Sequence, residues 1–262
     1  ASYMILQTNI LSLLKTMIND INNFIESKKL SLNSRKSYHY DLKQFYKIIG
    51  GHVNSEKLAL YQQSLSEFKL TARKRKLSAV NQFLFFLYNR GTLKEFYRLQ
   101  ETEKITLAQT KSQIMDLSNF YQDTDYPSGR LIALLILSLG LTPAEIANLK
   151  KADFDTTFNI LSIEKSQMKR ILKLPEDLLP FLLESLEEDG DLVFEHNGKP
   201  YSRQWFFNQL TDFLNEKNEQ QLTAQLLREQ FILKQKENGK TMTELSRLLG
   251  LKTPITLERY YR

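Results

Sequence analysis

The C-terminal part of the chain carries its clearest start and stop signals for helices. Thr223 stands before an apolar stripe with helical spacing, and Thr241 followed by Glu244 forms a capping box. Gly250 is the expected end of this second helix, because glycine adopts the left-handed conformation of a helix terminus without strain. We therefore predict two packed helices joined by a turn, followed by a short segment that carries Tyr260 ten residues after the glycine.

The rest of the chain has the same helical character. Apolar spacing before residue 91 predicts four helices, at roughly 17–28, 33–49, 55–67 and 71–90. Farther on we expect a buried helix at 130–139, a helix capped by Thr142 with Glu145, and a hairpin with strands at 160–163 and 170–174 and Lys165 in its turn. The predicted fold is mainly α with a small antiparallel sheet (α+β). Its expected parts are a helical domain at 17–98, a polar linker at 99–110 followed by a helix near Lys111, and a second domain at 111–262.

Composition excludes several classes of function. There is no cysteine, so neither a disulfide framework nor a sulfur metal site is possible, and the three histidines are too scattered to bind a metal. We expect no metal and no cofactor. No apolar run approaches the roughly 20 residues of a membrane span, and we find no signal peptide, so we expect no membrane partner and a cytoplasmic location. Met17 is the expected start, with 1–16 as upstream sequence.

Positive charge is concentrated in the first part of the chain. Residues 1–100 contain 16 Lys and Arg against 6 Asp and Glu, whereas 101–262 contain 20 against 24. A basic domain gains free energy from releasing counterions when it binds a polyanion, so the asymmetry indicates a nucleic acid partner; a solvated charged surface is the alternative. The cations expected to face phosphates are Arg35, Lys36, Lys43, Arg73 and Lys76.

Four stretches together resemble the tyrosine recombinases, the family of phage integrases and Xer proteins. In the first domain these are LSLNSRKSYHYDLKQFYKII and ARKRKLSAVNQFLFFLYNRG, which are similar to the family's core-binding domain. In the second domain LILSLGLTPAEIANLKKADFD is similar to the run around the family's first catalytic arginine, and 222–261 is similar to its C-terminal box. The resemblance implies the two-domain clamp of a Xer-type recombinase. The last stretch alone also looks like the helix-turn-helix of a repressor.

The resemblance assigns a catalytic site that is only partly present. It keeps Tyr260 as the nucleophile, Arg228 as a clamp for the phosphate and Lys165 as the acid. Thr142 replaces an arginine, Gln225 replaces a histidine, and Leu251 replaces a histidine or tryptophan. Neither threonine nor leucine supplies a charge, so the expected site binds a phosphate better than it cuts DNA.

These observations predict a protein that binds double-stranded DNA, with itself or another recombinase as a further partner, and that recombines DNA poorly or not at all. Two alternatives remain open. One is a working site-specific recombinase with a rearranged site that uses Tyr260. The other is an interaction module that kept the recombinase fold but does not bind DNA.

Overall fold

The chain forms two compact units, an N-terminal unit (1–108) and a C-terminal unit (109–262). The computed structural model describes residues 2–101, 103, 113–165 and 167–262, but not the side chains of 2–11, 13 and 14. The boundary between the units falls within the segment expected as a linker, of which 102 and 104–110 lie outside the described residues.

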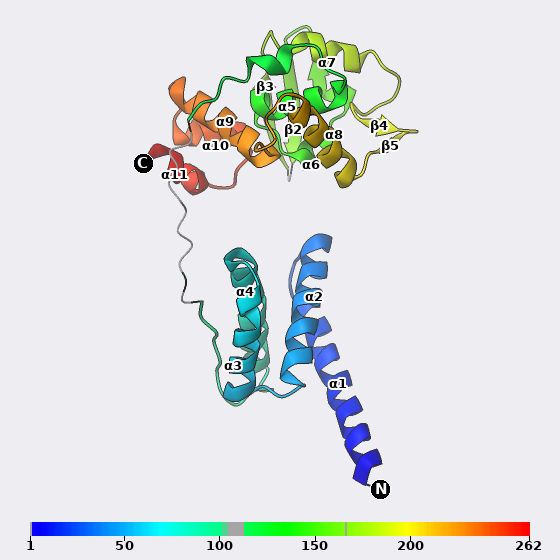
Figure 1. Ribbon diagram of the computed structural model, residues 1–262, viewed down its shortest axis with the longest axis vertical. Coiled ribbons are helices and arrows are strands. Elements are labelled where there is room, and N and C mark those ends of the chain that lie inside the picture. The colour runs from blue at the N-terminus through cyan, green and yellow to red at the C-terminus, as the bar shows by residue number, and fades with distance from the viewer. Residues whose placement is uncertain (1, 102, 104–112, 166) are drawn as a thin grey trace. The chain divides into compact units, whose positions relative to one another are not determined.

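The N-terminal unit is an assembly of helices (Figure 1). They are α1 (Ser2–Glu26), α2 (Leu32–Ile49), α3 (Ser55–Ser64), the 3-10 helix η1 (Leu65–Glu67) and α4 (Leu70–Asn89). Gly50 ends α2 with a φ of 63°, in the left-handed region. Aromatic rings fill the interior: the centroids of Phe24 and Phe83 are 5.5 Å apart, and those of Phe45 and Tyr61 are 4.8 Å apart. The four helices predicted from apolar spacing are confirmed, but α1 begins at Ser2, well before the predicted start at 17.

A buried helix organises the C-terminal unit. This helix, α5 (Pro127–Leu139), packs against α8 (Arg203–Glu216) and α9 (Ala224–Glu237). The close approach of α8 requires Gly129, because a Cβ there would lie 2.2 Å from the backbone oxygen of Gln209. The remaining helical elements before α8 are η2 (Ser118–Tyr121), α6 (Pro143–Ala147), η3 (Lys151–Asp153) and α7 (Leu179–Leu186).

The start of the C-terminal unit differs from the prediction. Lys111, where a helix is expected, lies outside the described residues, and 113–117 are irregular. The first helical element in the described part of this unit is η2.

An antiparallel sheet covers part of the helical core. Its strands lie in the order β1 (Phe154–Asp155), β2 (Ile160–Lys165) and β3 (Met168–Lys173), and a separate small hairpin joins β4 (Glu195–His196) to β5 (Lys199–Pro200). Ile163 pairs with Arg170, and Lys165 pairs with Met168. The predicted hairpin is therefore confirmed, but Lys165 ends a strand and does not lie in the turn.

The predicted C-terminal layout is confirmed. The Thr223 side chain caps α9, the Thr241 capping box begins α10 (Met242–Leu248), and Gly250 has a φ of 64°. The chain then forms η4 (Pro254–Leu257) and α11 (Glu258–Tyr261), whose tyrosines pack on a small apolar cluster around Phe231. The molecule is thus mainly helical with small antiparallel sheets, as predicted. Within the described part of the chain, we find no helix that is long and apolar enough to cross a membrane.

Candidate active site

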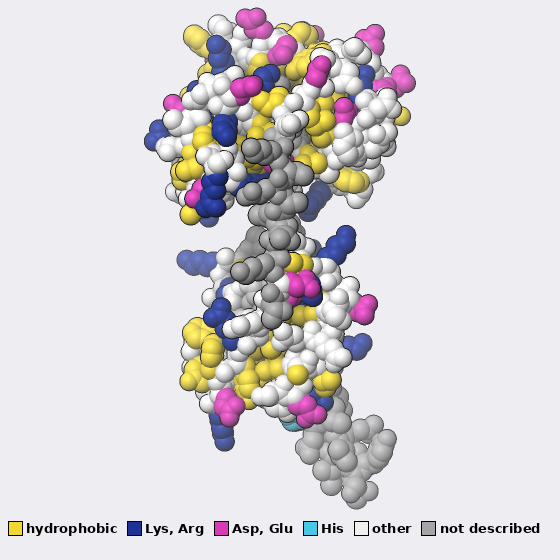
Figure 2. All heavy atoms as spheres, turned by 60° about the vertical axis from the view of Figure 1, so that its left-hand side comes forward, with side chains coloured by type: hydrophobic (Ala, Val, Ile, Leu, Met, Phe, Trp, Pro, Cys, Tyr) yellow, Lys and Arg dark blue, Asp and Glu magenta, His cyan; other side chains and the backbone are white. Residues whose placement is uncertain are grey.

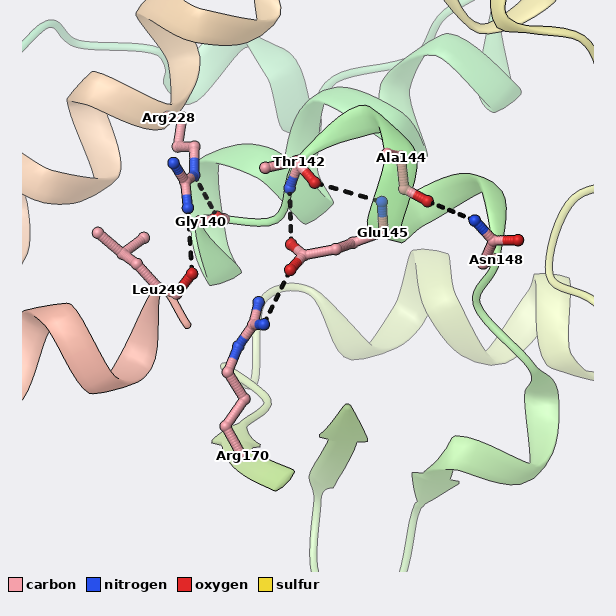
Figure 3. A network of polar contacts seen from close by, with 8 residues as sticks. All are labelled: Gly140, Thr142, Ala144, Glu145, Asn148, Arg170, Arg228 and Leu249. Carbon is pink, nitrogen blue, oxygen red and sulfur yellow. Dashed lines mark hydrogen bonds and ion pairs between the residues drawn. The ribbon is translucent and has the colours of Figure 1, made fainter. Parts of the chain in front are cut away.

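Arg228 is anchored between the ends of two helices. It lies one turn into α9, after a first turn that is held by the Thr223 cap. Its Nε donates to the backbone oxygen of Gly140 at 2.8 Å, and its Nη2 donates to that of Leu249 at 3.2 Å (Figure 3). Both acceptors are helix C-caps, where carbonyl groups lack helical partners. The guanidinium is therefore fixed in place, and its Nη1 has no hydrogen-bond partner among the described residues.

Thr142 acts as a helix cap. Its hydroxyl accepts a hydrogen bond from the backbone N–H of Glu145 at 3.3 Å, and its own N–H donates to Oε2 of Glu145 at 3.0 Å. This capping box begins α6, as predicted, and it adds no cation to the site. The same box holds the Glu145 carboxylate toward the hairpin of β2 and β3.

Arg170 brings a cation to the carboxylate of the Thr142 capping box. Its Nη1 donates to Oε1 of Glu145 at 2.8 Å, and both side chains are about nine-tenths buried (Figure 3). Burial favours the neutral acid, but the hydrogen bonds from Arg170 and from the Thr142 N–H outweigh it and hold the pKa of Glu145 below its ordinary value. Sequence reasoning missed Arg170. Its position two residues before the apolar Leu172 could have indicated it, because alternate residues of a strand face the same side of the sheet.

Lys165 lies on the same face of the hairpin as Arg170. The register places it opposite Met168, and it is two residues from Ile163, the partner of Arg170. Lys165 is exposed, and its charge contributes to lowering the pKa of Glu145. The structure therefore brings this predicted residue to the side of the hairpin that carries Arg170 and faces Glu145.

Tyr260, the expected nucleophile, is half-buried in α11. Its hydroxyl accepts a hydrogen bond from Nη2 of Arg259, which also lies 3.7 Å from Glu229. Burial is the main cause that raises the pKa of Tyr260, and Arg259 opposes it. The phenol also interacts electrostatically with Arg228.

Tyr261 is engaged elsewhere, because its hydroxyl donates to the backbone oxygen of Lys240 at 2.6 Å. Of the two tyrosines, Tyr260 is the one whose phenol interacts electrostatically with Arg228.

The other two replaced positions provide little chemistry. Gln225 is exposed in the first turn of α9. Leu251 is half-buried against the apolar cluster around Phe231, and its N–H donates to the backbone oxygen of Ser246 at 3.0 Å. No proton-transferring side chain therefore stands at either of these two positions.

In the N-terminal unit α2 carries several of the exposed cations. Lys36, Tyr40, Lys43 and Lys47 are exposed at helical spacing, so they form one stripe on the side of α2 away from its core residues. Figure 2 shows Lys and Arg side chains, in dark blue, projecting from this unit. Arg35 is exposed but lies off the stripe. Lys47 was missed by the sequence reasoning, although the same spacing would have found it.

The prediction that Lys76 faces a phosphate is wrong. This side chain is buried, and its Nζ donates to Asp41 at 3.0 Å and to Gln44 at 2.6 Å. Arg73 is largely covered as well, because it pairs with Glu103 at 2.5 Å and with Glu101 at 3.4 Å. Neither residue is free to meet a phosphate in this conformation.

Comparison with known proteins decides the family. The sequence model described as "Phage integrase family" matches residues 107–262. This chain belongs to the phage integrase family. A curated relative from Streptococcus agalactiae, named "Tyrosine recombinase XerD-like", is 99% identical over 246 residues, which make up 94% of this chain and 100% of the relative.

Two solved structures of phage integrase relatives show that the fold is shared. The Tn1549 transposon integrase in complex with transposon right end DNA matches with a TM-score of 0.71 and 11% identity, over 94% of each chain. The XerH site-specific recombinase bound to difH substrate matches with a TM-score of 0.68 and 15% identity, over 88% of this chain and 76% of that one. At such low identity these matches support the fold of this family member and leave its chemistry to its own residues.

Proposed function

We propose that this chain is a Xer-type tyrosine recombinase homologue that binds duplex DNA but cuts and rejoins it slowly or not at all. The observation that carries the proposal is the state of Thr142, whose side chain is used in a capping box where the family resemblance expects a phosphate-binding arginine. Tyr260 and Arg228 are both retained and interact electrostatically, which supports a phosphate-binding role for this part of the C-terminal unit.

Cleavage of a phosphodiester by a tyrosine requires more than these groups. The nucleophile must lose its proton, donors must stabilise charge on the non-bridging oxygens, and an acid must protonate the leaving 5′ oxygen. Loss of one preorganised donor costs about 10² to 10³ in rate, and loss of a general acid or base about 10² to 10⁴. Burial raises the pKa of Tyr260, which makes its deprotonation harder. Turnover is therefore expected to be slower by several orders of magnitude, although such losses do not simply add.

DNA binding is supported by two independent observations. The basic stripe on α2 (Lys36, Lys43 and Lys47) lies in the part of the chain with the largest excess of cations. Solved relatives with this fold are bound to DNA, namely the Tn1549 integrase and the XerH recombinase. The partner of this chain is therefore proposed to be double-stranded DNA, which it binds with itself or with another recombinase.

Covalent trapping tests the loss of cleavage. We expect the wild-type chain to bind a nicked suicide duplex without forming a denaturant-resistant protein–DNA band, and we expect Tyr260→Phe to bind equally well. Tyr261→Phe is the matched control, because it removes the neighbouring hydroxyl. A band in the wild type that disappears in Tyr260→Phe would establish the alternative of a working recombinase with a rearranged site.

The second alternative is an interaction module that does not bind DNA. A gel-shift assay in low salt separates it from the proposal, because phosphate neutralisation dominates nonspecific affinity and is strongest at low salt. If no complex forms there with genomic fragments, the proposal fails and the interaction module takes its place.

A further inference from the structure

One side of the Arg170 guanidinium lacks a hydrogen-bond acceptor among the described residues. The Arg170 side chain is 10% exposed, and Nη1 is the nitrogen that bonds to Glu145. Nε and Nη2 are buried and have no hydrogen-bond partner among the described residues. A buried donor without an acceptor is costly. These two nitrogens also form the fork of a guanidinium that meets two oxygens of one anion side by side.

The surroundings of this edge carry a surplus of positive charge. Burial is the main cause that lowers the pKa of Arg228, and the charge of Arg170 acts in the same direction, so the two guanidinium groups lie within electrostatic range. Lys165 adds a third cation from the same face of the hairpin. Glu145 opposes these charges, but a single carboxylate does not balance three cations. A bound anion would supply the missing charge.

The turn at Gly250 brings the two guanidinium groups together. A Cβ on Gly250 would lie 2.5 Å from Nη1 of Arg170, so the arginine is packed directly against this glycine. The preceding backbone oxygen, that of Leu249, accepts the hydrogen bond from Arg228. Arg170 and Arg228 therefore border the same turn, one from β3 and the other from α9.

We propose that Arg170 supplies, from β3, a second guanidinium to an oxyanion site that it forms with Arg228 and Lys165, and that the ligand is a backbone phosphate of DNA. The identity of the ligand rests on the proposed function, whereas the oxyanion site rests on the geometry alone. Glu145 orients the guanidinium by holding Nη1, and Thr142 holds Glu145. The threonine that replaces a cation thus supports a different cation at the same site.

Inorganic phosphate is the probe for the site. The full chain is titrated with phosphate, with chloride at equal ionic strength as the reference, and the Nε–Hε resonance of Arg170 is followed by NMR together with the melting temperature. The Arg170 resonance is assigned from its absence in Arg170→Lys. Phosphate is expected to shift this resonance and to raise the melting temperature, because a ligand that binds the folded state stabilises it.

Three substitutions separate a binding role from a structural one. Arg170→Gln is expected to weaken the apparent phosphate affinity by about tenfold or more, because it removes a charged two-point contact. Lys173→Gln removes one charge from the exposed face of the same strand and is expected to have little effect. Glu145→Gln retains an acceptor for the Thr142 N–H but removes the competing negative charge, so it is expected to tighten phosphate binding.

The outcomes distinguish this inference from the proposed function. If wild type does not respond to phosphate, if Arg170→Gln and Lys173→Gln respond alike, or if Glu145→Gln and Arg170→Gln only lower stability, the oxyanion site is wrong. If Arg170→Gln does not fold, Arg170→Lys decides, because lysine keeps the charge but loses the fork and should bind phosphate more weakly. A parallel DNA gel shift tests the proposed function. DNA binding without a phosphate response overturns only this inference. A phosphate response without DNA binding overturns the proposed function, and with it DNA as the source of the phosphate, but leaves the oxyanion site.

Discussion

Replacing Lys76 with alanine should destabilise the N-terminal unit without directly removing a DNA contact. The Lys76 side chain is 3% exposed and that of Asp41 is 1% exposed, and their charged atoms are 3.0 Å apart. Removing one partner of a buried ion pair costs about 3–5 kcal/mol, because it leaves the other charge uncompensated. Arg75 still pairs with Asp41 at 2.9 Å, so we expect a loss near the lower end, about 3 kcal/mol. Such a loss is a large fraction of the stability of a small domain.

Hydrogen exchange of the α2 and α4 amides in the full chain is the suitable assay, because it reports the opening of the N-terminal unit separately from that of the C-terminal unit. Lys74→Ala, in the same basic run, is the control and should change stability by no more than about 0.5 kcal/mol. DNA affinity is measured under conditions in which both variants are folded. Unchanged protection of α2 and α4 in Lys76→Ala, together with a large loss of DNA affinity, would refute the argument and return Lys76 to the DNA-binding surface.

Three further predictions concern DNA binding, the helix cap and pH. The double variant Lys36→Glu/Lys43→Glu should weaken duplex binding. The slope of log affinity against log salt concentration should fall by about one unit per lost phosphate contact. An unchanged slope in filter binding would exclude the α2 stripe as a DNA-binding surface. Thr142→Ala should cost about 1 kcal/mol in thermal unfolding and leave DNA affinity nearly unchanged, whereas the opposite pattern would make Thr142 a phosphate ligand. The pKa of Glu145 lies below its ordinary value of 4.5, so its ionised form stabilises the fold above that pH, and this stability is lost as the pH falls through the lowered pKa. Melting curves between pH 6 and 3 should show a smaller acid loss in Glu145→Gln than in wild type.

Features set by neighbouring residues could be predicted from the sequence. The capping boxes at Thr142 and Thr241 and the end of α10 at Gly250 depend on contacts within a few residues, and all three are as expected. The hairpin of β2 and β3 was also predictable, since its strands are adjacent in the chain. Its exact extent was not, because the pairing of Lys165 with Met168 depends on a tight turn rather than on the strand sequences.

The wrong prediction for Lys76 and the failure to find Arg170 have one physical cause, which is that burial of a charged side chain depends on a partner from another element. Lys76 lies at helical spacing from the buried Val80, Phe83 and Leu87, so the pattern itself places it on the core side of α4. Burial of this lysine needs the Asp41 carboxylate from α2 as a partner, and periodicity within one helix cannot identify a partner on another. Arg170 is the same case in a strand, with Glu145 as the partner from α6.

Under the proposed function, the cations around Glu145 bind a phosphate but do not by themselves accelerate cleavage of its ester bond. Donors such as Arg170 and Arg228 bind the charged oxygens in the ground state as well as in the transition state, and binding both equally well raises affinity without raising the rate of the chemical step. Acceleration would need groups that act only as the bond breaks, namely a base for the Tyr260 phenol and an acid for the leaving oxygen. The phenol is bound instead by Arg259, and burial raises its pKa. Of these proton-transfer groups the chain retains only Lys165, as the candidate acid, because Gln225 and Leu251 replace the other two. The chain is therefore expected to occupy a recombination site for longer than it takes an active relative to cut there, so DNA residence time is the property of this site to measure alongside cleavage.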